Sequence, residues 1–137
     1  MAENALAKKL KLKPGQRAAI VNAPEGYLKE LSPLPDEVEI ADKLSGKFDW
    51  VQIFVTTKAE ADKLAPRAVK ALKPESMLWI SFPKGSSKIQ TDLTRDKGWE
   101  ILQQADLRWL VLVSVNPTWS AFALRPYRLG EERQASR

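Results

Sequence analysis

The segment from Phe48 to Pro83 constrains the fold most, because it predicts a strand, a helix and a second strand in succession. Residues 50–55 and 77–82 are apolar runs, each interrupted by a single polar residue. Neither run alternates between apolar and polar positions, so both are expected to be buried on two faces, as strands of a parallel sheet are. Residues 58–72 carry apolar side chains at helical spacing. The segment therefore predicts a right-handed βαβ unit.

The predicted helix of this unit has a start signal and a stop signal. Thr57 followed by Glu60 is a capping box, in which each side chain satisfies a free backbone amide of the first turn. Lys73-Pro74 ends the helix, because proline has no amide hydrogen to donate. Pro66 lies inside the helical pattern, so we expect a kink or a restart there.

The rest of the chain predicts further strands and helices around this unit. Short strands are expected at 17–21 and 38–41, a short helix at 27–31, and a longer helix from Asp92 or Thr94 to about Ala105. Residues 107–115 and 119–125 are strand-like runs joined by Asn116-Pro117-Thr118, which is typical of a hairpin turn. The predicted fold is a three-layer, Rossmann-like α/β domain with a mostly parallel sheet of about six strands that ends in an antiparallel hairpin.

A chain of 137 residues has the size of one ordinary domain. We expect a flexible N-terminal lead-in over 1–13, a single α/β domain over 14–126 and a polar tail over 127–137. Leucines in the lead-in, at positions 6, 10 and 12, could still pack onto the domain. The sequence contains no apolar run of membrane-spanning length and no signal-peptide pattern, and we expect a cytoplasmic protein.

The absence of histidine and cysteine limits the kinds of catalytic and metal-binding site that the chain can form. The chain contains neither residue, which excludes a Ser-His-Asp triad, a cysteine nucleophile, a histidine base and a zinc site of the usual kind. Catalysis would have to use carboxylates, lysine, hydroxyl groups or a cofactor. No carboxylate spacing in the sequence indicates a magnesium site. The composition therefore favours a protein that is not an enzyme.

The net charge of +5 comes from the two ends of the chain. Residues 1–16 hold four lysines and one glutamate, and residues 125–137 hold four arginines and two glutamates, whereas residues 17–124 are neutral overall. A folded nucleic-acid-binding domain is expected to carry a basic face on the domain itself. The charge distribution therefore argues against DNA or RNA as a partner.

Two candidate ligand positions follow the first two predicted strands. Asn22 and Glu25 lie in the turn after the first strand, and Asp42 follows the second. The carboxyl ends of parallel strands meet at one edge of the sheet, where open α/β sheets bind ligands. A carboxylate there could act as a base or bind a hydroxyl or an amine. The alternative for each residue is an ordinary turn residue.

The polar loop after residue 83 is the third candidate. Lys84, Ser86, Ser87 and Lys88, with Gly85 supplying conformational freedom, could form an anion-binding nest. The same composition is also typical of a plain surface loop. Trp119 could stack on a planar ligand, although a buried indole is the commoner arrangement. The other four tryptophans lie on predicted core elements, and we expect them to pack.

Four stretches of the chain resemble an uncharacterised bacterial family, the domain of unknown function 3052: KLKLKPGQRAAIVNAPEGYLKEL, FDWVQIFVTTKAE, LKPESMLWISFPK and TWSAFALRP. The similarity spans about residues 6–126. The order of elements from residue 47 onward also resembles the fourth strand and all that follows in a class I methyltransferase-like Rossmann fold. The first resemblance implies no activity, because the family has none assigned.

The second resemblance implies a reduced cofactor pocket. Methyltransferases carry a glycine-rich turn after their first strand, and residues 22–27 do not supply one. Asp42 matches the acidic position after the third strand of that fold, so that one strand and one helix are missing. No cofactor is expected, and S-adenosylmethionine is the cofactor that the resemblance would imply.

Three functions follow from these observations. The first is a non-catalytic, methyltransferase-like binding or regulatory module for a protein partner or a small anionic metabolite. The second is an enzyme that uses S-adenosylmethionine or a nucleotide at the carboxyl edge of the sheet, with Asp42, Lys84 and Ser86 as contacts. The third is a structural protein that interacts through an exposed hairpin edge or its basic ends. The sequence does not predict the oligomeric state.

Overall fold

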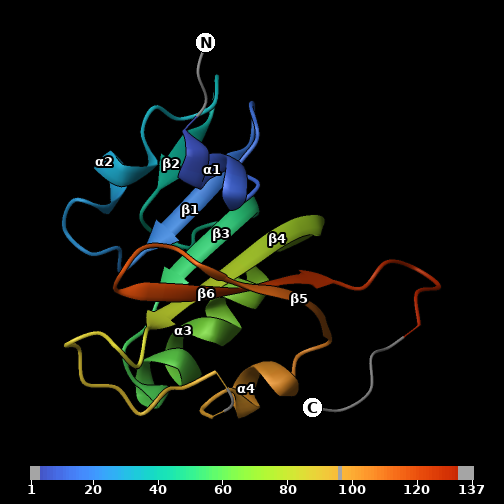
Figure 1. Cartoon of the computed structure of the whole chain (residues 1–137). Coiled ribbons are helices and arrows are strands. Elements are labelled where there is room, and N and C mark those ends of the chain that lie inside the picture. Colours follow the sequence, from blue (N-terminus) through green and yellow to red (C-terminus); the bar gives the residue numbers. More distant parts are fainter. Residues whose placement is uncertain (1–3, 96, 133–137) are drawn as a thin grey trace.

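In the computed structural model, which describes residues 4–95 and 97–132, the described chain forms a six-stranded sheet in the order β2-β1-β3-β4-β6-β5. The first four strands are parallel, and β6 and β5 form the antiparallel end (Figure 1). This confirms the predicted fold class and the predicted hairpin. The strands are β1 (Arg17–Val21), β2 (Glu39–Ala41), β3 (Phe48–Phe54), β4 (Leu72–Pro83), β5 (Leu107–Ser114) and β6 (Trp119–Pro126).

The central βαβ unit consists of β3, α3 (Lys58–Lys70) and β4. The hydroxyl group of Thr57 accepts a hydrogen bond from the Glu60 amide at 3.1 Å, which confirms the predicted helix start. The Glu60 carboxylate accepts from both the hydroxyl and the amide of Thr56, and the hydroxyl contributes most to lowering its pKa. The helix does not restart at Pro66, which lies within it.

The predicted boundary between α3 and β4 was wrong by several residues. We expected the strand at 77–82, but β4 begins at Leu72, which pairs with Phe48. The register between β3 and β4 shifts immediately after this pair. Pro74 lies in the part of the strand that the shift affects, and a proline in a strand is tolerated at such an irregularity. The helix ends at Lys70, and the strand continues through Pro74.

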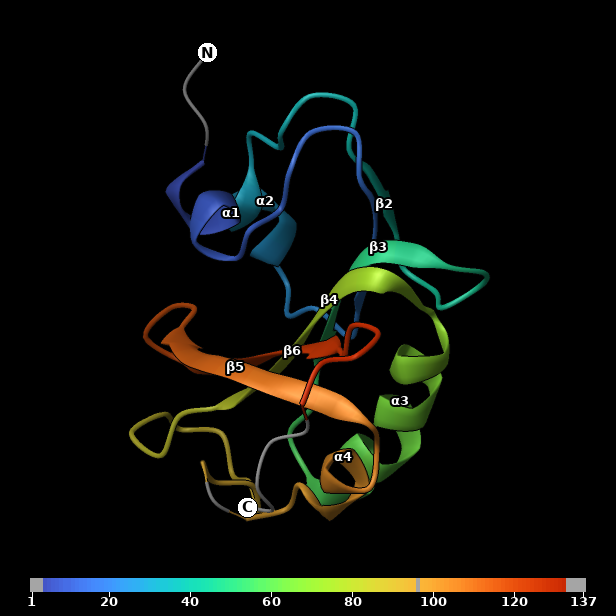
Figure 2. The ribbon, with the colours of Figure 1, turned by 90° about the vertical axis from the view of Figure 1, so that its right-hand side faces the viewer.

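Two layers of helix cover the two faces of the sheet (Figures 1 and 2). Helices α3 and α4 (Glu100–Gln103) lie on one face, over a core that includes Ile53, Ile80 and Phe122. Helices α1 (Ala5–Lys9) and α2 (Tyr27–Leu31) lie on the other face, over a core that includes Trp50 and Trp79. None of the helices in the described parts of the chain is long and apolar enough to cross a membrane.

The N-terminal segment is part of the folded core. The carbonyl oxygen of Leu10 accepts hydrogen bonds from the indole N–H groups of Trp50 and Trp79, both at 2.8 Å. The side chain of Asn4 caps α1, and its amide group donates to the carbonyl oxygens of Glu30 and Ser32. Residues 4–12 of the predicted flexible lead-in are thus docked on the sheet, whereas residues 1–3 lie outside the described part.

The connection from β2 to β3 is a loop over residues 42–47, where a crossover helix would be expected between parallel strands. The guanidinium group of Arg17 holds this loop, because it donates to the carbonyl oxygens of Ser45 at 3.2 Å and Lys47 at 3.0 Å. It also lies 4.4 Å from the centre of the Phe48 ring. The loop can replace a helix because β2 spans only Glu39–Ala41 and the return path is short.

The predicted helix from Asp92 or Thr94 to Ala105 was wrong. Within the described residues of that stretch only Glu100–Gln103 is helical. Gly98 has a φ of 99°, and a Cβ atom built there would lie 2.4 Å from the side chain of Leu93. This left-handed residue, packed against Leu93, prevents a continuous helix.

The C-terminal segment turns back onto the hairpin. The carboxylate of Glu131 accepts two hydrogen bonds from the Arg125 guanidinium, at 2.9 and 2.7 Å, and one from the Arg128 amide. The guanidinium of Arg108 lies 3.7 Å from the same carboxylate. These contacts order the first part of the predicted polar tail, whose residues 133–137 lie outside the described part.

Candidate functional site

The carboxyl ends of four parallel strands meet at one edge of the sheet, which is the edge that binds ligands in folds of this kind. The amino end of β6 lies at the same edge, because Trp119 pairs with Pro83 at the end of β4. All the candidate residues from the sequence lie at or near this edge. They form two groups, since β3 separates the ends of β1 and β2 from the ends of β4 and β6.

The first group consists of Asn22, Glu25 and Asp42, all of which are exposed. Ala41 pairs with Ala19, so Asp42 lies level with Ile20 on the neighbouring strand. Asn22 lies two residues further along that strand, an offset of roughly 7 Å at 3.3 Å per residue. Asn22 has a φ of 61° at the point where the chain turns away from the sheet. The structure thus places these residues on one edge without bringing them together into a compact site.

The position of Asp42 in the fold differs from the prediction. The sequence matched it to the acidic residue after the third strand, but β2 pairs directly with β1. In the Rossmann strand order the second strand lies beside the first, and an acidic residue associated with it binds the ribose hydroxyls. The strand order places β2 directly beside β1, so Asp42 follows the strand that occupies the second position of that order.

The turn after β1 is closed onto the sheet by Tyr27. The ring of Tyr27 is fully buried, and its centre lies 4.7 Å from that of Phe54. Its hydroxyl group donates to the Gln52 side-chain oxygen at 2.7 Å, and the Gln52 amide donates to the Ser81 hydroxyl at 2.9 Å. Burial raises the pKa of Tyr27, so the phenol stays protonated. Helix α2 follows the turn and ends at Leu31.

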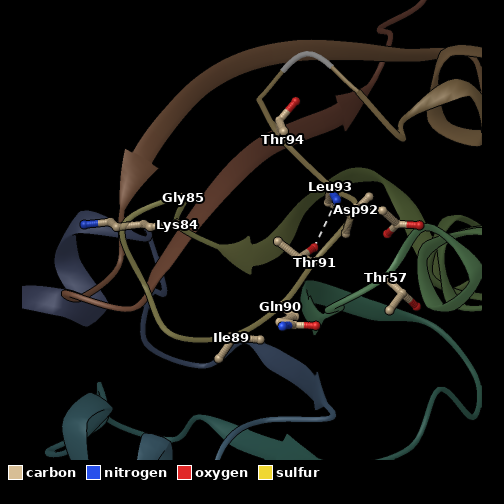
Figure 3. A pocket seen from close by; sticks show the side chains of 9 residues that line it. All are labelled: Thr57, Lys84, Gly85, Ile89, Gln90, Thr91, Asp92, Leu93 and Thr94. Carbon is tan, nitrogen blue, oxygen red and sulfur yellow. Dashed lines mark hydrogen bonds between the residues drawn. The ribbon is translucent and has the colours of Figure 1, made fainter.

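In the second group, Lys84, Ser86 and Ser87, the side chain of Lys84 is directed to the hairpin and not into the candidate anion nest. The Lys84 ammonium group donates to the Ser114 hydroxyl at 2.5 Å, and its backbone amide donates to the Thr118 carbonyl oxygen at 2.8 Å. Figure 3 shows the Lys84 side chain extending away from the other residues drawn. Ser86 is exposed, and the buried hydroxyl oxygen of Ser87 has no hydrogen-bond partner among the described residues. Lys84 therefore ties the loop to the hairpin.

Trp119 is a core residue, which corrects the proposal that it stacks on a ligand. Only 6% of its surface is exposed, and its ring packs edge-on against Phe54 with 5.0 Å between ring centres. The Asn116 side chain accepts hydrogen bonds from the amides of Thr118 and Trp119, which fixes the hairpin turn. The remaining tryptophans pack in or against the core, as predicted.

The carboxyl edge is hollowed beside the second group. An open pocket of about 600 Å³ lies between the start of α3 and the segment that follows β4 (Figure 3). Most of its polar side chains carry hydroxyl or amide groups. Its lining consists of Thr57, Lys84, Gly85, Ile89, Gln90, Thr91, Asp92, Leu93 and Thr94.

Specific contacts hold the wall of this pocket in place. The Asp92 carboxylate accepts a hydrogen bond from the Lys58 amide at 2.7 Å, which joins the wall to the first turn of α3. The Thr91 hydroxyl accepts from the Leu93 amide at 3.0 Å, and the Trp99 indole donates to the Thr94 carbonyl oxygen at 2.7 Å. The pocket wall is therefore a structured loop, and its residues Leu93 and Trp99 are buried in the same core as Ile80.

The sequence analysis missed Thr57, Gln90, Thr91 and Thr94 as lining residues. Thr57 and Thr94 were assigned to helix caps, and only Thr57 has that role in the structure. The sequence feature that could have identified these lining residues is the length of the polar segment 84–99, whose described residues contain no helix or strand. Loops of more than about 12–15 residues without regular structure are usually functional or disordered.

The pocket is lined by hydrogen-bonding groups, and its described residues form no arrangement of side chains that is typical of a catalytic site. One oxygen of Asp92 is occupied by the Lys58 amide, and the Lys84 ammonium group points to the hairpin. No group of three or more acidic side chains that could hold a metal ion occurs in residues 4–95 and 97–132. The arrangement is suited to holding a small polar molecule through hydroxyl and amide groups.

Comparison with solved structures identifies the fold. The ribosomal protein L11 methylase from Lactobacillus delbrueckii subsp. bulgaricus aligns with a TM-score of 0.58 at 15% identity, covering 89% of this chain and 76% of the methylase. A DhpI–SAH complex gives 0.61 at 12% identity, covering 90% and 82%. A SAM-dependent methyltransferase from Aquifex aeolicus gives 0.54 at 20% identity, covering 87% and 86%.

These similarities show that the chain has the Rossmann-like fold of SAM-dependent methyltransferases. No family model matches the sequence, and no curated protein matches it significantly.

Proposed function

We propose that this chain is a methyltransferase-like binding domain that holds a small polar ligand in the pocket beside the carboxyl ends of β3 and β4, without transferring a methyl group. The observation that carries the proposal is the structured segment 84–94, which forms most of the pocket wall. Ordering each residue of a loop costs about 1–2 kcal/mol of backbone entropy. The contacts of Asp92, Thr91 and Trp99 offset that cost at the edge where α/β folds bind ligands.

The ligand class follows from the lining. Thr57, Gln90 and Thr91 present hydroxyl or amide groups, whereas the nearest ammonium group, on Lys84, is directed elsewhere. The carboxylate of Asp92 in the same wall disfavours an anion. A neutral molecule rich in hydroxyl or amide groups suits this lining better than the small anion that the sequence suggested. The module would act as a sensor or regulatory domain that reports such a metabolite to a partner.

Two features support a role without methyl transfer. The turn after β1 lacks a glycine-rich cradle, and Tyr27 draws it onto the sheet. The loop 42–47 stands in place of a crossover helix, which reduces the elements around the first two strands. Both changes affect the half of the edge where a dinucleotide or a related cofactor binds in Rossmann folds.

An NMR titration tests the proposal with amide resolution. The probes are ribose as a neutral hydroxyl-rich ligand, inorganic phosphate as an anion, and S-adenosylhomocysteine. We expect saturable shifts for the neutral ligand at Thr57 and at residues 89–94. Gln90→Ala should weaken that binding about fivefold, since one hydrogen bond is worth about 1 kcal/mol. Ser86→Ala is the matched control, because Ser86 is exposed on the same segment outside the pocket lining.

Two outcomes would contradict the proposal. The first is the absence of saturable shifts at the pocket with any of the three probes. The second is transfer of a labelled methyl group from S-adenosylmethionine to any acceptor, which would establish an enzyme.

The second candidate function is an enzyme that binds S-adenosylmethionine at the ends of β1 and β2. Asp42 favours it, because its strand lies beside β1, where an acidic residue can bind ribose hydroxyls. Calorimetry with S-adenosylhomocysteine tests this candidate, with Asp42→Ala expected to weaken binding at least tenfold. Asp36→Ala is the control, as Asp36 is also an exposed carboxylate in this half of the chain. Equal affinities for the two variants would exclude a role for Asp42.

We further propose, on the four sequence stretches quoted above, that the chain is a bacterial member of the domain of unknown function 3052. A retained pocket lining in other members, read from an alignment of that family, would support both this assignment and the binding role. Replacement of the lining by apolar residues in most members would count against the binding role.

A further inference from the structure

The sheet ends on one side in a strand whose outer edge pairs with no other strand among the described residues. Strand β5 is last in the strand order and pairs only with β6. Figure 2 shows β5 along the side of the molecule that faces the viewer, with no strand beyond it. The opposite end of the sheet is β2, which spans only Glu39–Ala41. The two edges therefore differ in length, and only β5 offers an extended edge.

The exposed edge is apolar. From Trp109 to Val113 strand β5 has no charged or polar side chain. Val111 is 50% exposed and Leu112 is 39% exposed, and the two side chains lie on opposite faces of the sheet because they are adjacent in a strand. Monomeric proteins usually protect such an edge with lysine, proline or a short strand. The short strand β2 has that protection, whereas the register shift between Trp109 and Val111 protects β5 only near its start.

The backbone of β5 can accept a further strand over a defined stretch. The Val115 amide donates to the Trp119 carbonyl oxygen at 2.9 Å, so this is a hydrogen-bonded pair of the hairpin. Hydrogen-bonded and non-hydrogen-bonded pairs alternate along an antiparallel ladder. The amide and carbonyl groups of Leu112 and Ser114 therefore point away from β6. The register shift between Trp109 and Val111 ends the regular stretch, which leaves residues 111–115 for pairing.

We propose that β5 pairs with β5 of a second copy of this chain, antiparallel and across a two-fold axis at Val113. In this register the outward backbone groups of Leu112 in one copy meet those of Ser114 in the other, and Val111 packs against Val115. The pairing is isologous, so that each copy uses the same surface. It joins the two sheets into one and covers Val111 and Leu112.

Charge favours a second copy over a different protein as the partner. The stretch 111–115 contains no charged side chain, so no like charges on the paired strands lie directly opposite each other. The Lys84 ammonium group lies beside the stretch, where it donates to the Ser114 hydroxyl of its own chain. The nearest charge on the strand, Arg108, lies 3.7 Å from the Glu131 carboxylate of its own chain. A strand adapted to a different partner would be expected to carry charges that select that partner. A short pairing of this kind gives a small interface, so the dimer should be weak and concentration-dependent.

Sedimentation velocity and light scattering over micromolar to millimolar concentrations test the proposal. The average mass should rise from one chain toward two with concentration. Val111→Lys places a charge on the proposed interface, at a side chain exposed enough to tolerate it, and should weaken association at least tenfold. Leu28→Lys is the matched control, because Leu28 is 51% exposed on α2 and lies away from this edge. Far-UV circular dichroism confirms that both variants remain folded.

Disulfide crosslinking tests the proposed register between the two β5 strands. The chain has no cysteine, so Val113→Cys introduces a single thiol at the proposed axis. Directly opposed residues of a non-hydrogen-bonded antiparallel pair have Cα atoms about 4.5 Å apart, within the range of a disulfide. Mild oxidation should yield a covalent dimer much faster than in a Leu28→Cys control, and adding Val111→Lys should slow it.

Each contrary result would overturn the proposal. A mass of one chain at every concentration would exclude self-association. A dimer that Val111→Lys leaves intact, or a Val113→Cys variant that crosslinks no faster than Leu28→Cys, would place the interface elsewhere.

Discussion

The two halves of the sheet differ in completeness. The half around β3, β4, β6 and β5 has the 13-residue crossover helix α3 and a long antiparallel hairpin. The half around β1 and β2 has only the five-residue helix Tyr27–Leu31, a three-residue edge strand and a loop in place of a crossover helix. The comparison teaches that a Rossmann-like sheet tolerates the loss of helices on one side if other residues cover the exposed core.

In this chain the N-terminal segment provides that cover. Ala7, Leu10 and Leu12 are buried in the same core cluster as Trp50 and Trp79. The Leu10 carbonyl oxygen satisfies both buried indole groups at once. A few residues of α1 and the segment after it thus replace part of the packing that longer helices would supply.

The largest effect is expected for Leu10→Ala, in the reduced half. Loss of a fully buried leucine side chain should destabilise the fold by about 2–5 kcal/mol. If residues 4–12 also detach, the indole groups of Trp50 and Trp79 lose their common acceptor. Urea unfolding gives the change in stability, and hydrogen exchange of the two indole groups shows whether the segment has detached. Leu6→Ala is the control, since Leu6 is only half-buried in the same segment. Equal effects of the two changes would contradict the importance of this docking.

Gly98→Ala tests the complete half, with the next largest effect. A Cβ atom there would lie 2.4 Å from the Leu93 side chain at a φ of 99°, so we expect a loss of about 1–3 kcal/mol. Amide shifts in residues 91–94 should show that the pocket wall has moved. Gly85→Ala is the matched control, because Gly85 lies in the same segment and a Cβ atom there meets nothing within 4 Å. The account of the wall fails if the two variants are equally stable and leave the wall unchanged.

Tyr27→Phe should have a smaller effect, in the reduced half again. The change removes the donor to the buried Gln52 oxygen and keeps the ring in contact with Phe54. A lost hydrogen bond of this kind costs about 1–2 kcal/mol. Thermal unfolding measures the cost, and Tyr27→Phe combined with Gln52→Leu provides a double-mutant cycle. Additive losses in that cycle would show that Tyr27 and Gln52 are not coupled.

The smallest effect concerns the contact of Glu131 with the hairpin, in the complete half. Hydrogen bonds from the Arg125 guanidinium contribute most to lowering the pKa of Glu131 from 4.5 to about 2. Because the folded pKa is the lower one, this contact stabilises the chain above pH 4.5 and is lost as the pH falls toward 2. The Arg128 amide resonance should titrate in this window without global unfolding, and Glu131→Gln should abolish the titration. A Glu131 carboxyl that titrates near 4.5 would contradict the contact.

The sequence predicted most of the elements but not their contacts. The capping box at Thr57 and the turn at Asn116 appeared where expected, because each depends on a few neighbouring residues. The helix predicted over 92–105 did not, since the conformation of Gly98 is coupled to its contact with Leu93. The partners of Lys84 and Trp119 lie on other strands, so their local sequence could not exclude a ligand-binding role.

The sequence by itself determined the parallel core, because the apolar runs 50–55 and 77–82 do not alternate with polar residues and are therefore expected to be buried on both faces. It also excluded catalysis and metal binding by histidine or cysteine, because the composition shows that the chain contains neither residue. Only the tertiary structure decided that β2 lies beside β1, that residues 4–12 complete the core, and that the pocket lies next to the 84–99 segment. These facts depend on which distant residues meet, and the free energy of such contacts is not encoded in any local pattern.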